Sequence, residues 1–191
     1  ENGKLHHKGS YVAGKEEGIW ESYFENGEIN TRGRFVEGKM SGKWEVFYPD
    51  GSRKTQTDYK EGVKNGTEIL YDENGSIYQK ADYKEGVMNG RWERYVEGIL
   101  IEKGGYVEGK KDGLWIFYAQ NGYKQREQEF KQGKPNGKWV EYFSANKKSA
   151  EGEYADGQKT GTWKNYDKKG NVITETVFKN GKKIKEEIKK K

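Results

Sequence analysis

Six tryptophans, the side chains in this sequence best suited to hold a ligand, recur at a nearly constant spacing. They are Trp20, Trp44, Trp92, Trp115, Trp139 and Trp163, and they follow a 24-residue period that one shorter copy interrupts. A tyrosine follows five of them by three residues, at Tyr23, Tyr95, Tyr118, Tyr142 and Tyr166. A row of aromatic rings can stack on sugar faces or hold a quaternary ammonium group by cation–π attraction. We therefore predict this aromatic ladder as the ligand- or partner-binding site.

Apart from the aromatic ladder, the sequence gives little support for a catalytic or metal-binding site. The two histidines, His6 and His7, are adjacent on a predicted strand, so their rings would point to opposite faces. There is no cysteine nucleophile, nucleophile elbow or phosphate-cradling loop. Glu21, Glu45 and Glu93 recur in register, which is typical of a cross-strand charge ladder and not of an isolated acid/base pair. The sequence predicts no enzyme, no cofactor and no metal site.

The residues around each tryptophan repeat with it, so the elements that carry the ladder form a tandem array. Each copy reads approximately G-x-[YF]-x-x-G-K-x-x-G-x-W-x-x-Y-x-x-N-G. The third copy has Glu68 in place of tryptophan, and the fourth is one residue shorter around residues 96–98. The glycine two residues before the tryptophan position recurs as Gly18, Gly42, Gly66, Gly90, Gly113, Gly137 and Gly161.

Two turn signals in each copy predict a β-hairpin. Asn26-Gly27, Asp50-Gly51, Asn74-Gly75 and Asn121-Gly122 are the pairs that suit a two-residue type I′ turn. The opposite connection, as in residues 37–42, is predicted to be longer. About fifteen strands of roughly 5 to 8 residues remain between the turns.

Alternation along the strands assigns the side chains to faces. Gly33 and Phe35 share one face, while Arg32 and Arg34 share the other. The small residue at Gly33 leaves room for an indole from the next strand, and Gly9, Gly104 and Gly152 occupy equivalent positions. Tryptophan and the tyrosine three residues later have opposite parity, so aromatic rows should line both faces. The predicted fold is all-β: an elongated, twisted, single-layer antiparallel meander of tandem hairpin repeats.

The composition suits a thin array better than a thick globular core. Only 31% of the 191 residues are hydrophobic and 35% are charged, a balance that ordinarily suggests disorder. The 14% aromatic content and the strict repeat argue against disorder, because each repeat needs to pack only on its neighbours. We assign residues 1–178 to the repeat array.

The net charge of +5 is concentrated at one end of the chain. Residues 179–191 hold seven lysines and two glutamates, so residues 1–178 are neutral overall. A neutral array is not the basic stripe expected for nucleic acid. We predict a basic C-terminal tail at residues 179–191, either a solvated end or a contact with an anionic surface, and membrane contact only through it.

The sequence does not decide in which cellular compartment the protein resides. The absence of cysteine excludes disulfides without deciding the redox environment. The chain has no initiator methionine and opens on Glu1-Asn2-Gly3, residues typical of the turn in the middle of a repeat. We therefore expect a fragment from which an upstream strand and any export signal have been removed.

The recurring Tyr-x-x-Gly-Lys-x-x-Gly-x-Trp-x-x-Tyr-x-x-Asn-Gly resembles the tryptophan-containing second variant of the MORN repeat (membrane occupation and recognition nexus). This variant is common in bacterial proteins that are often labelled as antitoxin components. The resemblance covers the chain from Gly3 to about Gly181. It implies one β-hairpin per repeat, an elongated sheet, and a role in protein or lipid contact.

These patterns favour a non-enzymatic protein-interaction scaffold at the bacterial envelope or cell surface, with an unidentified protein partner. The open edges of the terminal strands could also support end-to-end self-association. The alternatives are a module that binds cell-wall glycan or choline, a module that binds a lipid surface, and a cytosolic antitoxin component. The neutral array argues against lipid binding outside the tail.

Overall fold

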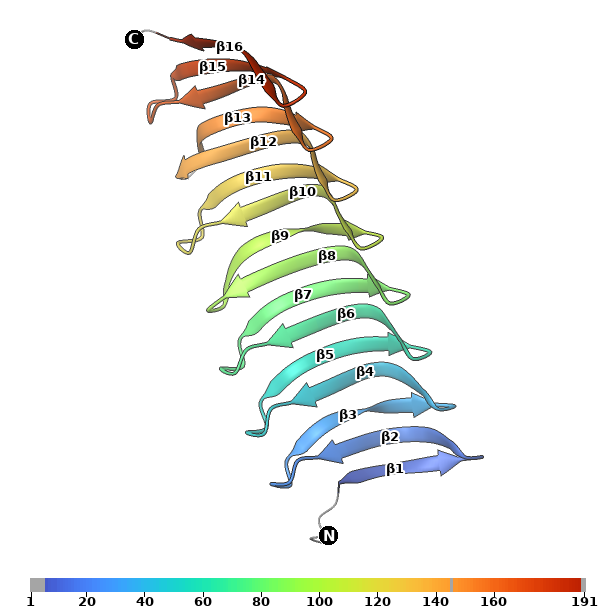
Figure 1. Ribbon diagram of the computed structural model, residues 1–191. Helices are drawn as coiled ribbons and strands as arrows, with labels where there is room; N and C mark the ends of the chain where they lie inside the picture. Colours follow the sequence, from blue (N-terminus) through green and yellow to red (C-terminus); the bar gives the residue numbers. More distant parts are fainter. Residues whose placement is uncertain (1–5, 145, 190–191) are drawn as a thin grey trace. The chain divides into compact units, whose positions relative to one another are not determined.

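The computed structural model describes residues 6–144 and 146–189, and all the regular elements in these ranges are β-strands (Figure 1). They fall into two units, residues 1–98 and 99–191. The first unit contains β1 His7–Val12, β2 Lys15–Tyr23, β3 Ile29–Val36, β4 Lys39–Phe47, β5 Arg53–Lys60, β6 Val63–Tyr71, β7 Ile77–Lys84 and β8 Val87–Val96. The second contains β9 Ile99–Val107, β10 Lys110–Tyr118, β11 Lys124–Lys131, β12 Lys134–Ser144, β13 Lys147–Ala155, β14 Gln158–Tyr166, β15 Val172–Lys179 and β16 Lys182–Ile188.

Within each unit, every strand pairs antiparallel with its neighbours in chain order. Among the described residues β1 pairs only with β2 and β16 only with β15, so the strands do not close into a barrel. The predicted all-β class and the antiparallel meander of hairpins are confirmed. The described strands number sixteen, against about fifteen predicted.

Two sequence predictions concern the chain ends. Glu1-Asn2-Gly3, the predicted mid-repeat turn, lies outside the described residues. At the other end, most of the predicted basic tail is a strand, because residues 182–188 form β16 and pair with β15. Lys183 and Glu186 of β16 form an ion pair of 2.6 Å. The hairpin pattern therefore continues beyond residue 178.

The two connections of each repeat are the reverse of those predicted. Asn26-Gly27 lies in a five-residue connection in which only Gly27 has a positive φ, of 91°. The amide of Gly27 donates to the carbonyl of Phe24 at 2.9 Å, and the amide of Phe24 donates to that of Glu28 at 2.8 Å. These bonds close a wider turn, and the side chain of Asn26 accepts from the amide of Glu28 at 3.0 Å.

The tight two-residue turn is instead the Glu-Gly pair. Glu37 and Gly38 have φ of 49° and 78°, as a type I′ turn requires. Glutamate in this region costs about 1 kcal/mol. The amide of Gly38 donates to the carbonyl of Glu16, one hairpin earlier, at 2.9 Å. This bond between successive hairpins recurs at five other turns and offsets the cost, which is a long-range effect that the local residue pair does not reveal.

Every tryptophan strand is bulged at the glycine two residues before the tryptophan position. All seven of these glycines have positive φ, and the pairing with the preceding strand shifts register there. They fall into two groups. In the first group, the residue of the preceding strand that faces the tryptophan position is glycine, and the bulge glycine has a φ of 64–80°; its members are Gly18, Gly42, Gly113 and Gly161. Where that facing residue is Thr57, Ala81 or Gln128, φ is 104–126°, at Gly66, Gly90 and Gly137.

The second group has its own hydrogen bond. An acidic residue follows each of the three larger facing residues, and its carboxylate accepts from the backbone amide that follows the bulge glycine. The distances are 3.2 Å for Asp58 and Thr67, 3.1 Å for Asp82 and Arg91, and 2.8 Å for Glu129 and Lys138. The acid therefore satisfies an amide that the wider bulge takes out of the strand ladder.

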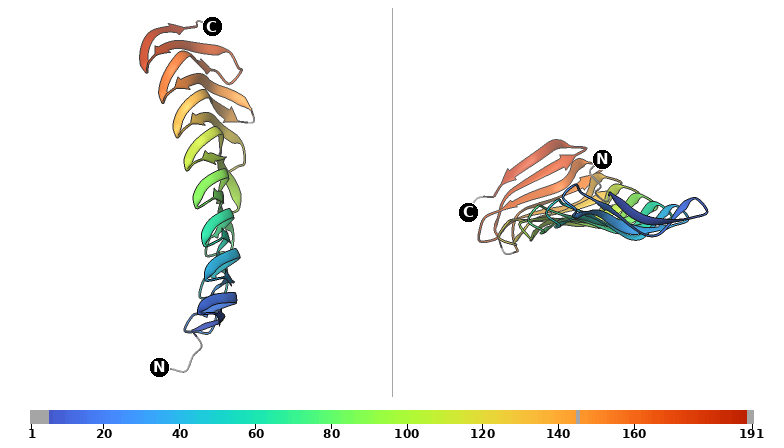
Figure 2. Two further views of the ribbon diagram at one scale, coloured as in Figure 1. Left: turned by 90° about the vertical axis from the view of Figure 1, so that its right-hand side faces the viewer. Right: turned by 90° about the horizontal axis from the view of Figure 1, so that it is seen from below.

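Bulges bend a strand and increase its twist. The strands of both units are accordingly curved, which is clearest from the side (Figure 2). The curvature arises in every hairpin, because every tryptophan strand carries a bulge. In four of the hairpins, the indole lies next to the bulge, on a glycine of the preceding strand.

The first prediction concerns the contact between indole and glycine. A Cβ at Gly104 would lie 2.2 Å from a ring carbon of Trp115, whose side chain is fully buried. We expect Gly104→Ala to lower the free energy of unfolding of the second unit by about 3 kcal/mol, measured by urea titration with tryptophan fluorescence. The control is Ala81→Gly, which only adds space under Trp92 and should cost about 1 kcal/mol. Equal unfolding curves for the two variants would contradict the steric account.

The second prediction concerns the tight turns. Asparagine tolerates positive φ better than glutamate, and Asn180 already stands at the equivalent position of the last such turn. We expect Glu61→Asn to raise the free energy of unfolding by about 0.5 kcal/mol in urea titration. Glu73→Asn is the matched control, since Glu73 lies in a wide turn and has no positive φ. A gain of the same size at Glu73 would refute the reversed turn assignment.

Candidate functional site

The six predicted tryptophans project from the even-numbered strands, and four of them share one arrangement. Each indole lies on a glycine of the preceding strand, as Trp44 does on Gly33. The ring nitrogen donates to the carbonyl of the residue after that glycine, over 3.1 Å from Trp44 to Arg34. Trp20, Trp115 and Trp163 repeat both contacts, with donor distances of 3.2–3.3 Å. The predicted room for an indole above these glycines is confirmed.

Other aromatic rings hold the indoles edge to face. Phe35 lies between Trp20 and Trp44, with centroid distances of 5.6 and 5.0 Å and interplanar angles of 82° and 78°. In the second unit, Tyr106 and Phe130 flank Trp115 in the same way. Such edge-to-face pairs add stability beyond the area they bury. Rings of neighbouring strands therefore pack in a row from Trp20 to Trp44 and around Trp115.

Most of the ladder is closed to solvent. Trp44, Trp92, Trp115 and Trp163 are between 0 and 9% exposed, so their rings are occupied by packing. Trp20 and Trp139 are half-buried. The structure thus leaves two of the six predicted tryptophans accessible to a ligand, and their binding role stays a prediction.

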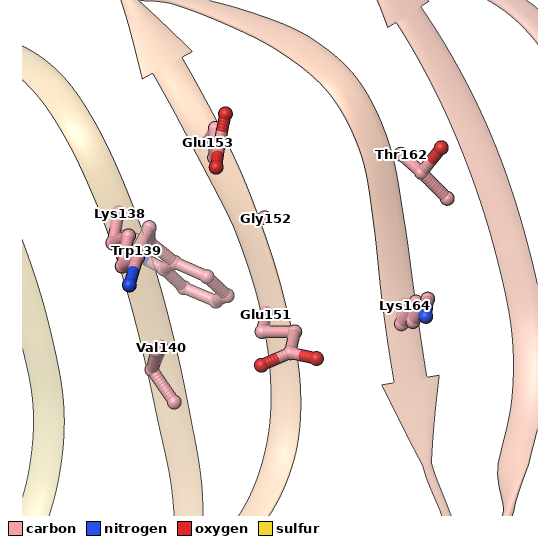
Figure 3. Close-up of a pocket in the computed structure, with 8 residues that line it drawn as sticks. All are labelled: Lys138, Trp139, Val140, Glu151, Gly152, Glu153, Thr162 and Lys164. Atoms are coloured by element: carbon pink, nitrogen blue, oxygen red, sulfur yellow. The ribbon is translucent and has the colours of Figure 1, made fainter.

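Trp139 departs from the common arrangement because Gln128 takes its place. The side-chain amide of Gln128 donates to the carbonyl of Glu129 at 2.9 Å, the acceptor that an indole uses elsewhere. Trp139 instead stands 5.0 Å from Trp163 at 36°. Its ring extends from β12 toward Gly152 of β13 (Figure 3).

A hollow of about 430 Å³ lies beside Trp139. Its lining comes from three strands: Lys138, Trp139, Val140, Glu151, Gly152, Glu153, Thr162 and Lys164 (Figure 3). Lys148 pairs with Glu151 at 2.6 Å, and the hydroxyl of Tyr166 also donates to this carboxylate. Two lysines and two glutamates face this hollow, so it has no net charge that would select an ion.

The third repeat fills the tryptophan position with a buried glutamate in a partly buried ion pair. Glu68 is 7% exposed, and Lys64 lies 2.5 Å from its carboxylate. Thr57, which faces Glu68 on β5, donates to the same carboxylate at 3.4 Å. Lys64 also lies 4.9 Å from the centre of the Tyr83 ring. This repeat therefore contributes a charged pair and no indole to the ladder.

The sequence reasoning missed the position four residues before each tryptophan. There the nitrogen of Lys111 lies 3.6 Å from the centre of the Trp115 ring and that of Lys159 lies 4.0 Å from Trp163. Lys111 also pairs with Glu102 at 3.1 Å. The other members of this column are Glu16, Met40, Lys64, Met88 and Pro135. An alignment of the repeats with one another could have revealed this position, because lysine recurs there in three of the seven copies.

The predicted tyrosines lie on the face opposite the tryptophans, as their parity indicated. Their hydroxyls bond carboxylates on that face: Tyr23 donates to Glu21 at 2.7 Å, Tyr95 to Glu93 at 2.6 Å and Tyr142 to Glu127 at 2.8 Å. Tyr118, also half-buried, has Lys103 5.8 Å from its ring centre. The tyrosines therefore belong to a hydrogen-bonded charge network and not to the tryptophan row.

Charged partners complete the tyrosine face. Glu45 pairs with Arg32 at 2.8 Å and with Arg53 at 3.0 Å, which is the predicted cross-strand ladder. Burial, followed by the hydrogen bond to Glu93, raises the pKa of Tyr95 to about 12. Burial and the bond to Glu151 raise the pKa of Tyr166 to about 12. Raised tyrosine pKa values of this kind weaken any role in proton transfer near neutral pH.

Metal binding has no candidate cluster in residues 6–144 and 146–189, where no group of three or more His, Asp or Glu side chains could hold an ion. His6 and His7 are both exposed. Within the same ranges, no helix is long and apolar enough to cross a membrane.

Comparison with known families places the repeats. The family described as MORN_2, a MORN repeat variant, matches residues 16–37, 40–61, 64–85 and 159–180. Each matched stretch corresponds to one hairpin and the first residue of the tight turn that follows it, as β2, β3 and Glu37 do for the first. No curated protein matches the chain.

The third prediction follows from the tyrosine pKa values. Because Tyr95 and Tyr166 hold their protons more tightly in the folded state, they stabilise it fully below pH 10 and lose this contribution as the pH rises toward 12. We expect the urea midpoint to fall across this window, and to fall less steeply in a Tyr95→Phe/Tyr166→Phe variant. Tyr78→Phe, at an exposed tyrosine, should leave the slope unchanged. Equal slopes for the double variant and the wild type would contradict the assignment.

Proposed function

Because the chain belongs to the MORN_2 repeat-variant family, we propose that it is a non-enzymatic protein-interaction scaffold. The proposal is supported by how the repeat uses its reactive side chains. Most of the tryptophans are buried, and four of the five predicted tyrosines are bonded to carboxylates, so both sets serve the frame. A scaffold needs a rigid frame that presents regularly spaced exposed groups.

The observation that carries the proposal is a row of exposed valines in the first unit. Val12, Val36, Val63 and Val87 are 61, 40, 47 and 47% exposed, and each adjoins a tight turn. Each valine pairs across its hairpin with an exposed lysine: Lys15, Lys39, Lys60 or Lys84. We call these eight residues the valine row.

The geometry of the valine row suits a protein partner. Val12 and Val36 are two strands apart, as are Val63 and Val87, which separates the members of each pair by about 10 Å, whereas Val36 and Val63 are three strands, or about 14 Å, apart. Exposed apolar side chains arranged in a contiguous row typically mark a contact surface, whereas single ones do not. The four lysines of the row lie beside the turn residues Glu37, Glu61 and Glu85, so the row and its turns together have no single sign of charge that would favour nucleic acid.

Self-association through strand edges is a weaker part of the proposal. All seven residues of β16 are exposed, as expected of an open edge. Lys182, Lys183 and Lys185 lie on it, and edge lysines oppose pairing with another strand. We therefore assign partner binding to the valine row and not to this edge.

The fourth prediction tests the valine row. Val36→Thr/Val63→Thr/Val87→Thr keeps β-branched side chains, so we expect the sheet to persist while apolar contact is lost. Partner proteins retained by the immobilised wild-type chain should be retained at least about tenfold less by this variant, the equivalent of roughly 1.4 kcal/mol. Quantitative mass spectrometry of the retained proteins provides the measurement.

A matched control changes exposed apolar residues outside the row. Ile19→Thr/Leu114→Thr/Ile173→Thr alters side chains that are 62, 49 and 37% exposed. It should retain partners as the wild type does. Equal retention by all three proteins would refute the valine row as the binding surface. Envelope and cytosolic extracts are used separately. A scaffold at the envelope should retain partners from the envelope extract, whereas an antitoxin component should retain one toxin from the cytosolic extract.

A further inference from the structure

The tryptophan ladder of the second unit already binds ammonium groups. Lys111 lies 3.6 Å from the centre of the Trp115 ring and 5.5 Å from that of Phe130. Lys159 lies 4.0 Å from Trp163 and 5.2 Å from Phe178. Each lysine comes from the position four residues before the tryptophan. An indole and the aromatic ring of the following strand thus form a cation site that the chain fills itself.

The first repeat has the same rings but the opposite charge at this position. Trp20 and Phe35 lie 5.6 Å apart at 82°, and Tyr11 packs against Trp20 at 5.2 Å. The residue four positions before Trp20 is Glu16, whereas Met40 fills the second repeat and lysine fills the third, fifth and seventh. Within the described residues, Glu16 has no ion-pair partner. The cation that the rings accommodate elsewhere is therefore not supplied here by the chain.

A hollow of about 420 Å³ occupies this place. Its lining includes Tyr11, Glu16, Trp20, Phe35, Met40 and Trp44. Tyr11 is 63% exposed and Trp20 is half-buried, so the hollow opens to solvent. It is large enough for an extended side chain, and all its aromatic walls are held edge to face by neighbouring rings.

The charges of this hollow select a cation. The face of an aromatic ring carries negative electrostatic potential, so a ring repels a carboxylate and attracts an ammonium group. Glu16 lines the same hollow as Trp20 and adds a full negative charge to it. An ammonium group placed between them would gain both the cation–π attraction and the ion pair, as Lys111 does with Trp115 and Glu102 at 3.1 Å.

We propose that the hollow at Trp20 binds the ammonium group of a lysine side chain presented by a partner protein. A primary ammonium on a flexible apolar stem is the ligand that the equivalent positions of the second unit already hold. The proposal adds a binding site to the scaffold function. It rests on that function for one point, that the partner is a protein. It concerns the tryptophan face, whereas the valine row lies at the tight turns.

The test uses the indole N–H signals of the ¹⁵N-labelled chain in nuclear magnetic resonance, with Trp20→Phe to assign the signal of Trp20. The probe is Nα-acetyl-lysine methylamide, and Nα-acetyl-norleucine methylamide is its uncharged counterpart. We expect the lysine probe to shift the Trp20 signal saturably at millimolar concentration. The signals of Trp115 and Trp163, whose sites hold their own lysines, should stay in place. The norleucine probe should shift Trp20 at least about tenfold less.

Two variants decide the role of Glu16. Glu16→Lys installs the residue found at positions 111 and 159, so it should fold normally and occupy the hollow itself, lowering the affinity for the probe by about tenfold or more. Glu16→Gln keeps the shape without the charge and should weaken binding several-fold. Binding unchanged in both variants, or equal shifts of all the indole signals, would overturn the proposal.

A third probe separates the sources of the cation. Tetramethylammonium carries the charge without a lysine stem, and tighter binding of it than of the lysine probe would overturn the assignment to lysine in favour of a quaternary amine. The outcome is independent of the valine row. Loss of partner retention in the valine variant alongside an unresponsive Trp20 would leave the scaffold standing and remove this site.

Discussion

The contact between an indole and the bare backbone of the preceding strand is the constraint on which the rest of each unit depends. A sheet without a second layer has no other place to bury a ring of that size. Gly33 and Gly104 let Trp44 and Trp115 lie flat enough for their ring nitrogens to reach a backbone carbonyl. The bulge glycine two residues before each tryptophan gives the strand the backbone conformation in which the indole approaches the preceding strand. The repeat therefore conserves glycines in pairs across neighbouring strands, one for space and one for backbone conformation.

The repeats that lack the facing glycine show how tightly the two sites are linked. With Thr57, Ala81 or Gln128 in that place, the bulge glycine changes φ from 64–80° to 104–126°. In these three cases the next residue is acidic and bonds the amide released by the wider bulge. A larger facing residue is thus accompanied by an acidic neighbour in all three cases, although Glu153 beside Gly152 shows that an acid also occurs where the facing residue is glycine. Gln128 goes further, because its amide takes the carbonyl that an indole would use and displaces Trp139 toward Trp163.

Much of this could be predicted from the sequence, because the period, the strand alternation and the small residue under the indole are local patterns. The turn types could not. Asn26-Gly27 has the composition of a tight turn, whereas Glu37-Gly38 gains its stability from a bond to Glu16 in an earlier strand. The burial of Trp44 and the partial exposure of Trp20 also escaped prediction, since the same Gly-x-Trp motif gives both. The difference lies in neighbours from other hairpins, which the motif does not contain.

Function in such an array belongs to the side chains that the frame itself does not use. Wherever the pattern is complete, its chemically capable groups are already paired: lysine with indole, tyrosine with carboxylate, arginine with glutamate. A ligand that competed for these groups would have to displace an internal partner of the same kind. Some positions that depart from the consensus have no such partner, although Glu68 pairs with Lys64. Glu16 beneath an intact set of rings is one of them. The exposed valines recur at successive tight turns, where the frame requires no apolar side chain, so they too are available for contact.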